Sequence, residues 1–333
     1  MVEYRKAREE EAADILDFIN YVFSQAHKPH DFRKFNPPMY GSDYPFWKEH
    51  YVAVEDGRIK ATLSITKRQI ECAGETFTYG HVGQVSVHPY ARGEGHMKRL
   101  MNMANDDMIN DGFDFSELGG LRQRYGYFGY TQGRPQYRMT VTTTNTRHAL
   151  HGRECILTAR QRPHEGGWSF LYDILDEKGN IVGKAGGNLL ELDDPYLAPD
   201  ACEAYFRASG EQQMTISAQM HEVERIRVIN SFCENICLAN SAMYKIYDFR
   251  KYLKAALTRR AQENMLPDGE MYVQIDKTPL HILVKEGQVT VEEGKAGQGA
   301  YLSAMQAQEM IFSPASPVLY QDAPAGWFPV SVL

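Results

Sequence analysis

The sequence has no long hydrophobic run, and this absence excludes a common class of membrane protein. No apolar stretch in its 333 residues approaches the roughly 20 that a membrane-spanning helix needs. The first sixteen residues, MVEYRKAREEEAADIL, are rich in charge and lack the apolar core of a secretory signal peptide. We therefore expect a cytosolic protein with no membrane partner.

Cysteine and positive charge are also scarce. The five cysteines are an odd number and widely scattered, and the closest pair, in CENIC, lacks the partner ligands of a zinc site. We expect reduced structural thiols and no metal. Lysine and arginine number 36 against 43 aspartates and glutamates, a net charge of −7. This balance argues against nucleic acid as the main partner and is compatible with cationic substrates.

The apolar periodicity predicts a mixed sheet with helices on both faces in the first part of the chain. Short strands are expected at residues 2–5 and 113–117, and a long antiparallel hairpin series at 51–54, 59–70 and 76–87. Helices are expected at 9–23, 95–110 and, shorter, at 121–125. Residues 27–47 contain many prolines and aromatics, so we expect an irregular segment that forms either a pocket wall or a lid over the core.

The stretch VGQVSVHPYARGEGHM, residues 82–97, has the pattern of an anion-binding turn. An alternating strand ends at His88-Pro89, a glycine-containing turn follows, and an amphipathic helix begins at once. Backbone N–H groups and the positive end of the helix dipole would face a bound anion there. Gly93 and Gly95 allow close approach of the backbone, and Arg92 adds a positive charge. A pyrophosphate would suit this turn, although an ordinary strand–turn–helix is the simpler interpretation of two glycines.

Two motifs together resemble the GNAT acetyltransferases. VSVHPYARGEGHMKRLM, followed by RYGYFGY, is similar to the acetyl-CoA-binding core of that family. In GNATs, a strand splays from its neighbour and an Arg/Gln-x-x-Gly-x-Gly/Ala turn holds the pyrophosphate; Arg92 and Gly95 match its first two positions. Met97 replaces the usual small residue. A large apolar residue there, together with Gly119-Gly120 upstream of the second motif, resembles the Eis-type (enhanced intracellular survival) subgroup.

The resemblance implies a fold of the α+β or α/β class and an acetyl-CoA cofactor. The GNAT acyl-CoA-acyltransferase fold is a mixed sheet with splayed strands. We expect Val85, Ser86 and Val87 to offer backbone groups to the pantetheine arm. The turn residues expected at the cofactor are Arg92, Gly93, Glu94, Gly95, His96 and Met97.

Acyl transfer from a thioester to an amine needs a proton donor for the departing thiolate. A tyrosine hydroxyl suits a thiol leaving group, because the pKa values of the two groups are similar. In GNATs, the tyrosine four residues before the Gly-aromatic pair often has this role, and that position is Tyr125. Tyr127 and Tyr130 are rivals, and buried packing is the alternative for all three.

The base that deprotonates the amine is harder to locate. In Eis-type enzymes, the resemblance implies that the C-terminal carboxylate, here that of Leu333, reaches the active site of the first domain. The apolar tail GWFPVSVL favours docking, and a last strand tucked into the third domain is the alternative. His88 and Glu117 are further candidates. His96 is expected to serve the cofactor or to have no role in proton transfer.

The rest of the chain is divided by the same resemblance into two further domains. We expect a catalytic GNAT domain at residues 1–140 and a degenerate GNAT-like domain at 141–247, which lacks the Arg-x-x-Gly-x-Gly turn. A sterol-carrier-protein-like α+β domain is expected at 248–333. Within them, residues 140–146 are expected as a β-rich connection, 168–175 and 181–190 as a hairpin, and 301–310 as a helix.

The sequence thus predicts an acetyl-CoA-dependent N-acetyltransferase. The acceptor is expected to be a primary amine on a small molecule or a lysine side chain, and a homo-oligomer is compatible with the scaffold. The competing class is a non-catalytic acyl-CoA-binding or lipid-binding protein on the same scaffold, because a fold does not fix a function.

Overall fold

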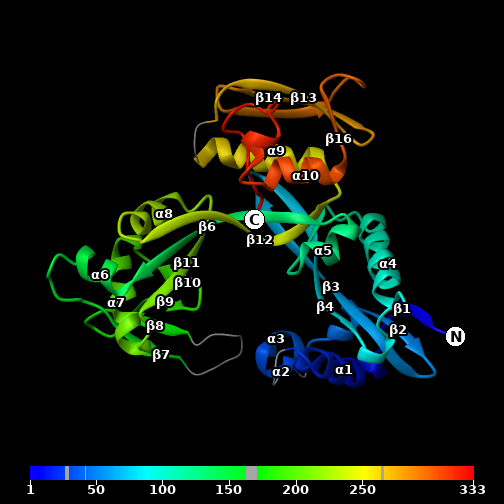
Figure 1. Ribbon diagram of the computed structural model, residues 1–333, viewed down its shortest axis with the longest axis horizontal. Coiled ribbons are helices and arrows are strands. Elements are labelled where there is room, and N and C mark those ends of the chain that lie inside the picture. Colours follow the sequence, from blue (N-terminus) through cyan, green and yellow to red (C-terminus); the bar gives the residue numbers. More distant parts are fainter. Residues whose placement is uncertain (27–29, 42, 163–170, 264–265) are drawn as a thin grey trace. The chain divides into compact units, whose positions relative to one another are not determined.

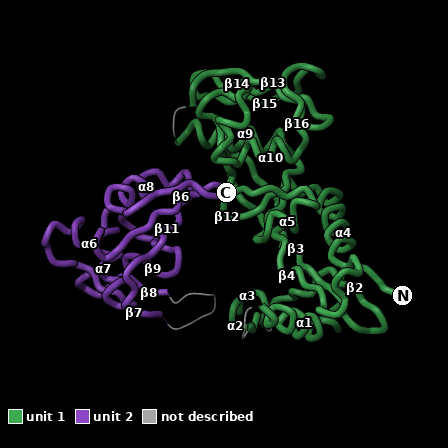
Figure 2. Tube along the Cα trace, in the orientation of Figure 1, with its two compact units in different colours: residues 1–134, 240–333 green, residues 135–239 purple. Residues whose placement is uncertain are grey.

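The chain forms two compact units (Figure 2). A computed structural model describes residues 1–26, 30–41, 43–162, 171–263 and 266–333. Unit 1 contains residues 1–134 and 240–333, and unit 2 contains residues 135–239. The chain passes between them within two strands, β6 (Thr131–Thr142) and β12 (Asn235–Ile246).

Unit 1 is built on a mixed sheet with the strand order β1-β2-β3-β4-β5-β12 (Figure 1). Its first members are β1 (Glu3–Lys6), β2 (His50–Glu55), β3 (Arg58–Cys72), β4 (Glu75–Val87) and β5 (Phe115–Leu118). These strands pair antiparallel except β4 and β5, which are parallel. A parallel pair needs a crossover, and α4 (His96–Asn110) supplies it.

Helices cover both faces of this sheet, as predicted. On one face, Leu100, Ala104 and Met108 of α4 pack on Leu63 and Val82 of the strands. The opposite face carries α1 (Ala12–Ser24), which follows the short 3₁₀ helix η1 (Glu9–Glu11). Its apolar stripe contacts β2, and the cluster contains Ile15, Leu16, Ile19, Val52 and Val54.

The aromatic segment after α1 is more regular than expected. It contains the helical turns α2 (Phe32–Phe35), α3 (Pro37–Tyr40) and η2 (Phe46–Glu49), while residues 27–29 and 42 lie outside the described part. The Asp31 side chain caps α2 by accepting from Arg33 N–H, and Pro37 starts α3. These local signals are stronger than the composition of the segment suggested.

The C-terminal part of unit 1 has its own helices and a second sheet. Helix α9 (Phe249–Glu263) is followed by strands in the order β15-β14-β13-β16, then by α10 (Ala304–Phe312) and α11 (Ser316–Leu319). The strands are β13 (Gly269–Ile275), β14 (Thr278–Lys285), β15 (Gln288–Glu293) and β16 (Ala300–Leu302). The helix expected at 301–310 therefore begins later, because residues 300–302 pair with β13 and Ser303 forms a capping box with Gln306.

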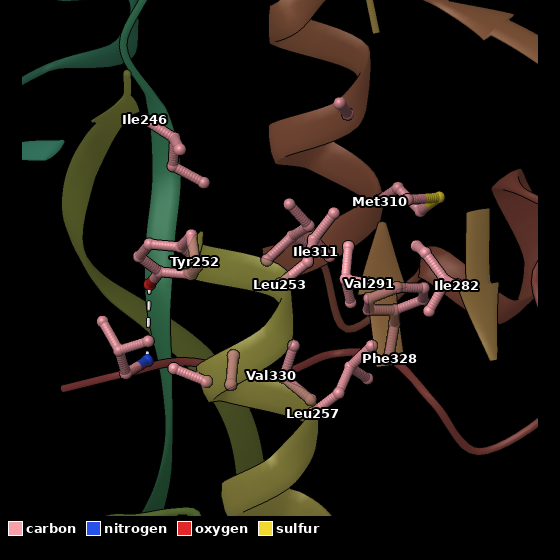
Figure 3. Close-up of a cluster of buried hydrophobic side chains, with 14 of the residues drawn as sticks. Ile246, Tyr252, Leu253, Leu257, Ile282, Val291, Met310, Ile311, Phe328 and Val330 are labelled. Atoms are coloured by element: carbon pink, nitrogen blue, oxygen red, sulfur yellow. Dashed lines mark hydrogen bonds between the residues drawn. The ribbon is translucent and has the colours of Figure 1, made fainter. Parts of the chain in front are cut away.

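One hydrophobic cluster joins this C-terminal part to the first sheet. In it, Tyr252 and Leu253 of α9 lie with Ile311 of α10 and Phe328 of the tail (Figure 3). Tyr252 meets the ring of Phe115 on β5 edge to face, with centroids 5.5 Å apart. The last residues of the chain therefore pack into the core of unit 1.

Unit 2 pairs β6 with β11 (Gln213–Gln219) and has a separate antiparallel sheet in the order β10-β9-β8-β7. That sheet contains β7 (Thr158–Gln161), β8 (Tyr172–Leu175), β9 (Ile181–Gly186) and β10 (Leu189–Leu192). The helices are α6 (Thr143–Ala149), α7 (Ala198–Ser209) and α8 (Val223–Asn230), with a 3₁₀ turn, η5 (Pro195–Leu197), before α7.

Two expectations for unit 2 were wrong. Of the β-rich connection expected at residues 140–146, residues 140–142 lie in β6, but residues 143–149 are helical, because Thr142 and Asn145 form a capping box that starts α6. The strand expected at 181–190 is divided into β9 and β10 by a turn at Gly187 and Asn188, in which Gly187 has a positive φ of 60°. Of the strand expected at 168–175, residues 168–170 lie outside the described part.

The expected domain boundaries at 140/141 and 247/248 fall near the unit boundaries at 134/135 and 239/240. Because the chain forms two units, the division into three domains stays a prediction. No helix among the described residues is long and apolar enough to cross a membrane. The five cysteines are unpaired.

Candidate acetyl-donor site

Strands β4 and β5 separate beyond Val82, and this leaves one edge of β4 free. Their last paired residues are Val82 and Leu118. Just beyond this point, Gln84 adopts a positive φ of 47° and the pairing of β4 with β3 shifts, which bends the strand. On the described part of β5, no residue pairs with Val85 to Val87, so the backbone groups on that edge can bind an extended ligand.

The turn after β4 leads directly into α4. A 3₁₀ turn, η3 (Pro89–Ala91), is capped by the His88 side chain, which accepts from Tyr90 N–H. Gly93 and Gly95 follow at φ 91° and 83°, a backbone conformation that favours glycine, and Gly95 is the N-cap of α4. A Cβ built on either glycine would meet no protein atom within 4 Å. The turn is therefore an open cradle at a helix N-terminus, a geometry that binds anions.

A groove of about 770 Å³ runs from this turn along β4. This volume suits a ligand of cofactor size. Of the predicted residues, the groove is lined by Val85, Val87, Arg92, Gly93, Gly95, His96 and Met97. Both ends of the groove fit a CoA-type ligand. One end has the free edge of β4, and the other has the anion-binding cradle at Gly93 and Gly95.

Two of the predicted cofactor residues do not line the groove. Ser86 alternates with Val85 and Val87 and is buried on the opposite face of β4, with its hydroxyl unpartnered among the described residues. The Glu94 side chain instead accepts from His96 Nε2 at 3.0 Å. Tyr4 Oη lies 2.7 Å from His96 Nδ1, so the His96 ring is held between two partners. This arrangement fixes the start of α4 and supports the expectation that His96 takes no part in proton transfer.

Several groove residues were not predicted. Lys98 and Arg124 add two cationic side chains to Arg92, and α1 contributes Val22, Phe23 and Ala26. The Lys98 ammonium lies 4.9 Å from the centre of the Tyr127 ring. The positive charge suits phosphates. Lys98 could have been found from the sequence, since it lies in the first turn of the helix, whereas the contribution of α1 depends on tertiary packing.

Tyr125 lies next to the groove, at the end of α5 (Arg122–Tyr125) and before the 3₁₀ turn η4 (Gly126–Phe128). Its neighbours Arg124, Tyr127 and Phe128 line the groove. The ring fills the space where a Cβ on Gly120 would lie, 2.2 Å from Cε2, so residue 120 must be glycine if the ring is to keep this position. Burial raises the pKa of Tyr125, and Arg124 opposes this only in part. The hydroxyl is therefore protonated at neutral pH.

The rival tyrosines have different surroundings. Tyr130 is fully buried, and its hydroxyl lies 2.8 Å from Ser116 Oγ and 3.3 Å from Asn105 Oδ1. Tyr127 is exposed over two thirds of its surface. Of the three, Tyr125 alone combines burial with a position beside the groove, and its hydroxyl interacts with Arg124, which lines the groove.

The candidate bases are dispersed. His88 stacks on Tyr21 of α1 at 5.5 Å. Leu333 is partly buried against the cluster around Tyr252, with the preceding Val332 carbonyl accepting from Arg259 Nη1 at 3.2 Å. The structure does not place Leu333 among the residues that line the groove.

Glu117 belongs to a polar cluster where β4 and β5 separate. Its carboxylate accepts from Tyr244 Oη at 3.0 Å and lies 3.2 Å from His81 Nδ1. Burial alone would raise the pKa of Glu117, but the hydrogen bonds from His81 and Tyr244 and the charge of Arg134 bring it below its usual value. His81 was not singled out from the sequence, because its pairing with Glu117 depends on the register of two strands 36 residues apart.

These features define a class of protein: a mixed sheet whose central parallel strands part over a groove that ends in an anion-binding turn. Residues 3–133 match the family model described as acetyltransferase (GNAT) domain. This part of the chain therefore belongs to the GNAT acetyltransferases, as the sequence predicted, and the acyl donor of the domain is acetyl-CoA. No curated protein matches the chain.

Solved structures share the fold over nearly the whole chain. A probable N-acyltransferase from Enterococcus faecalis V583 is 14% identical, with a TM-score of 0.62 over 93% of this chain and 90% of that one. A GCN5-related N-acetyltransferase from Kribbella flavida is also 14% identical, with a TM-score of 0.60 over 91% and 88%. Eis1 from Mycobacterium abscessus is 10% identical, with a TM-score of 0.55 over 93% and 89%. At these identities the likeness concerns the fold, and it confirms the expected Eis-type fold.

Proposed function

We propose that the protein transfers the acetyl group of acetyl-CoA to a primary amine, on a small molecule or a lysine side chain, with Tyr125 as the general acid. The observation that carries the proposal is the continuous groove from the cradle at Gly93 and Gly95 to the free edge of β4, with a protonated tyrosine beside it. A protein that only bound acyl-CoA or lipid would have no need of a proton donor at this place.

Different residues of the groove would hold different parts of the donor. Arg92, Lys98 and Arg124 offer positive charge for phosphates, together with the N–H groups at the start of α4. The backbone at Val85 and Val87 offers hydrogen bonds to an extended amide-containing arm. When bound, acetyl-CoA supplies the acetyl group as a thioester: the C–S bond breaks as the C–N bond of the amide forms.

Tyr125 would hold the proton that the departing sulfur needs. Because burial raises its pKa, the hydroxyl stays protonated until a strong base develops beside it. The Leu333 carboxylate stays a proposed acceptor for the proton of the amine. All groove-lining residues lie between residues 22 and 128, in keeping with the proposed division into a catalytic domain at 1–140 and two domains, 141–247 and 248–333, without a donor site. A cytoplasmic location and assembly into a homo-oligomer are likewise proposals.

The test compares wild type with Tyr125→Phe across a panel of primary amines. We expect kcat to fall by about 10²- to 10⁴-fold, the usual contribution of a general acid, with acetyl-CoA affinity by calorimetry little changed. Tyr301→Phe, at an exposed position in β16, is the matched control and should keep wild-type turnover. Wild type that binds acetyl-CoA yet acetylates no amine faster than Tyr125→Phe would favour the non-catalytic binding protein.

A further inference from the structure

One face of the first sheet changes from apolar to polar in its middle. On this face, Val52 and Val54 pack under α1, and Phe77, Tyr79 and Phe115 pack near α9. Between these two apolar clusters, the side chains that the strand alternation places on the face are polar or glycine: Thr62, Ser64, Thr66, His81, Gly83, Ser86 and Glu117. Buried polar positions cost stability unless they are paired. Thr62, Ser64, Thr66 and Glu117 have hydrogen-bond partners, whereas the Ser86 hydroxyl has none among the described residues.

His81 lies in register with a residue on each neighbouring strand. Its partner on β3 is Thr66 and its partner on β5 is Glu117. Thr66 Oγ1 in turn donates to Glu49 Oε2 at 2.6 Å. The charged and titratable groups around His81 are therefore Glu117 directly, Tyr244 and Arg134 through Glu117, and Glu49 through Thr66.

The two ring nitrogens of His81 have different environments. Nδ1 lies 3.2 Å from the Glu117 carboxylate, which is buried and ionised, so Nδ1 carries the proton and donates it. Nε2 is then an acceptor and makes no hydrogen bond to any described residue. The side chain is about one third exposed, so a ligand can reach it.

His81 lies where β4 and β5 part, on the face of β4 opposite to Val85 and Val87. A Cβ built on Gly83 would lie 4.0 Å from His81 Nε2. Gly83 is the first residue of β4 beyond the last pair with β5, and Val85, two residues further, already lines the groove. A basic nitrogen therefore lies at the point where the two strands part, and an amine that enters from this face of β4 would meet the thioester of the proposed donor there.

We propose that His81 Nε2 accepts the proton of the acceptor amine and that Glu117 is the positioning residue that keeps Nδ1 protonated. This inference rests on the proposed acetyl transfer. The ammonium acceptor gives one N–H proton to Nε2, and the lone pair of the resulting neutral amine forms the C–N bond. The C–S bond breaks, the Tyr125 proton goes to sulfur, and the second N–H proton of the attacking nitrogen passes to solvent, which leaves a neutral amide. The His81 and Tyr125 groups are restored through solvent after the products leave.

The first test is the pH profile of kcat/KM with an alkylamine from the panel, for wild type, His81→Gln and Glu117→Gln. We expect His81→Gln to lose about 10²- to 10³-fold at neutral pH and to lose the rise of activity with pH that a base produces. Glu117→Gln, which can still accept from Tyr244, should lose about tenfold and shift that rise. His281→Gln and Glu270→Gln, which remove a His–Glu pair of 2.8 Å in the second sheet, should match wild type.

Three further measurements separate proton transfer from structural damage. Added imidazole should restore activity to His81→Ala, which a folding defect would not allow. Trifluoroethylamine, which is uncharged near neutral pH, should lose less rate than the alkylamine on replacement of His81. Acetyl-CoA affinity should stay within about twofold in each variant, by calorimetry.

The rival base is tested by deleting Val332 and Leu333. If the deletion abolishes the rise with pH while His81→Gln keeps it, the terminal carboxylate is the base and the assignment of His81 is overturned. Unchanged turnover in His81→Gln overturns the assignment alone, because wild-type activity would still support acetyl transfer. Wild type that acetylates no amine overturns the proposed function and this inference together.

Discussion

At the scale of single residues, His50 shows how the core constrains a titratable group. It is fully buried, and its Nδ1 lies 2.9 Å from Thr62 Oγ1, which itself donates to the Tyr51 carbonyl. Thr62 therefore accepts from His50 Nδ1–H. Among the described residues, Nε2 has no hydrogen-bond partner, and burial lowers the pKa of His50 to about 3. The folded protein thus holds this ring neutral.

A neutral buried histidine makes stability depend on pH. Between pH 6.5 and about 3, the unfolded chain binds a proton that the folded chain does not, so the free energy of unfolding falls as pH falls. We expect His50 to account for a loss of about 2 kcal/mol between pH 6.5 and pH 5. Urea unfolding of wild type and His50→Gln at both pH values measures it: the difference between the two proteins should shrink by that amount.

The exposed site His148→Gln is the control, and its unfolding curves should follow wild type at both pH values. If the difference in unfolding free energy between wild type and His50→Gln is the same at pH 6.5 and at pH 5, the folded state can protonate His50.

At the scale of elements, the start of α4 depends on glycine for two separate reasons. Gly95 needs a left-handed backbone, and its Cα faces the groove. Gly95→Ala should cost roughly 1 kcal/mol of stability from the backbone and raise the Kd of acetyl-CoA by about tenfold, because the new methyl group enters the ligand space. Calorimetry with acetyl-CoA and urea unfolding measure the two effects.

Gly57 provides the matched control. It has φ 72° in the turn between β2 and β3, and a Cβ there also meets no atom within 4 Å. Gly57→Ala should lose similar stability and bind acetyl-CoA normally. Equal affinities for the two variants would mean that the cradle at Gly95 does not contact the donor.

The sequence predicted the elements of the first sheet and the donor turn well, because both have local signals. The alternation of apolar and polar residues predicted β3 and β4, and the spacing of Arg92, Gly95 and Met97 predicted the turn before α4. Local signals also caused an error: seven residues rich in threonine suggested a β-rich connection at 140–146, but the strand ends at Thr142, where a capping box starts a helix. β-propensity is weak against such context.

The part of the site that could not be predicted consists of contacts between distant segments. His81 meets Glu117 only because β4 and β5 pair in one particular parallel register, and Phe23 reaches the groove only because α1 packs on the sheet. Neither residue belongs to a motif. Recognising the turn was therefore sufficient for the donor, whereas the acceptor side needed the structure.

At the scale of the whole molecule, the C-terminal part of unit 1 completes the core of the first sheet. One cluster unites Phe77 and Phe115 of that sheet with α9, α10 and the tail residues Trp327, Phe328, Val330 and Val332. The Lys251 ammonium also pairs with the Asp114 carboxylate at 2.8 Å. One apolar face of the first sheet is therefore covered only by the C-terminal part of unit 1, among the described residues.

A chain ending at Tyr247 should expose this apolar face. We expect such a chain to bind the dye ANS strongly and to aggregate, since large exposed apolar patches drive association. Dye fluorescence and size-exclusion chromatography, compared with the full chain, measure this. A monomeric truncated chain that unfolds cooperatively at the urea midpoint of the full chain would show that residues 1–247 fold without the C-terminal part.

The packing of Trp327 and its neighbours also sets an order of events during synthesis. Phe115 leaves the ribosome about 200 residues before Trp327, which at typical elongation rates is a delay of roughly 10 to 40 s. For that time the aromatic face around Phe77 and Phe115 has no cover from its own chain. A nascent polypeptide of this kind is a natural client for chaperones that bind apolar surface, and the core of the first sheet would be completed only after Trp327 has been synthesised.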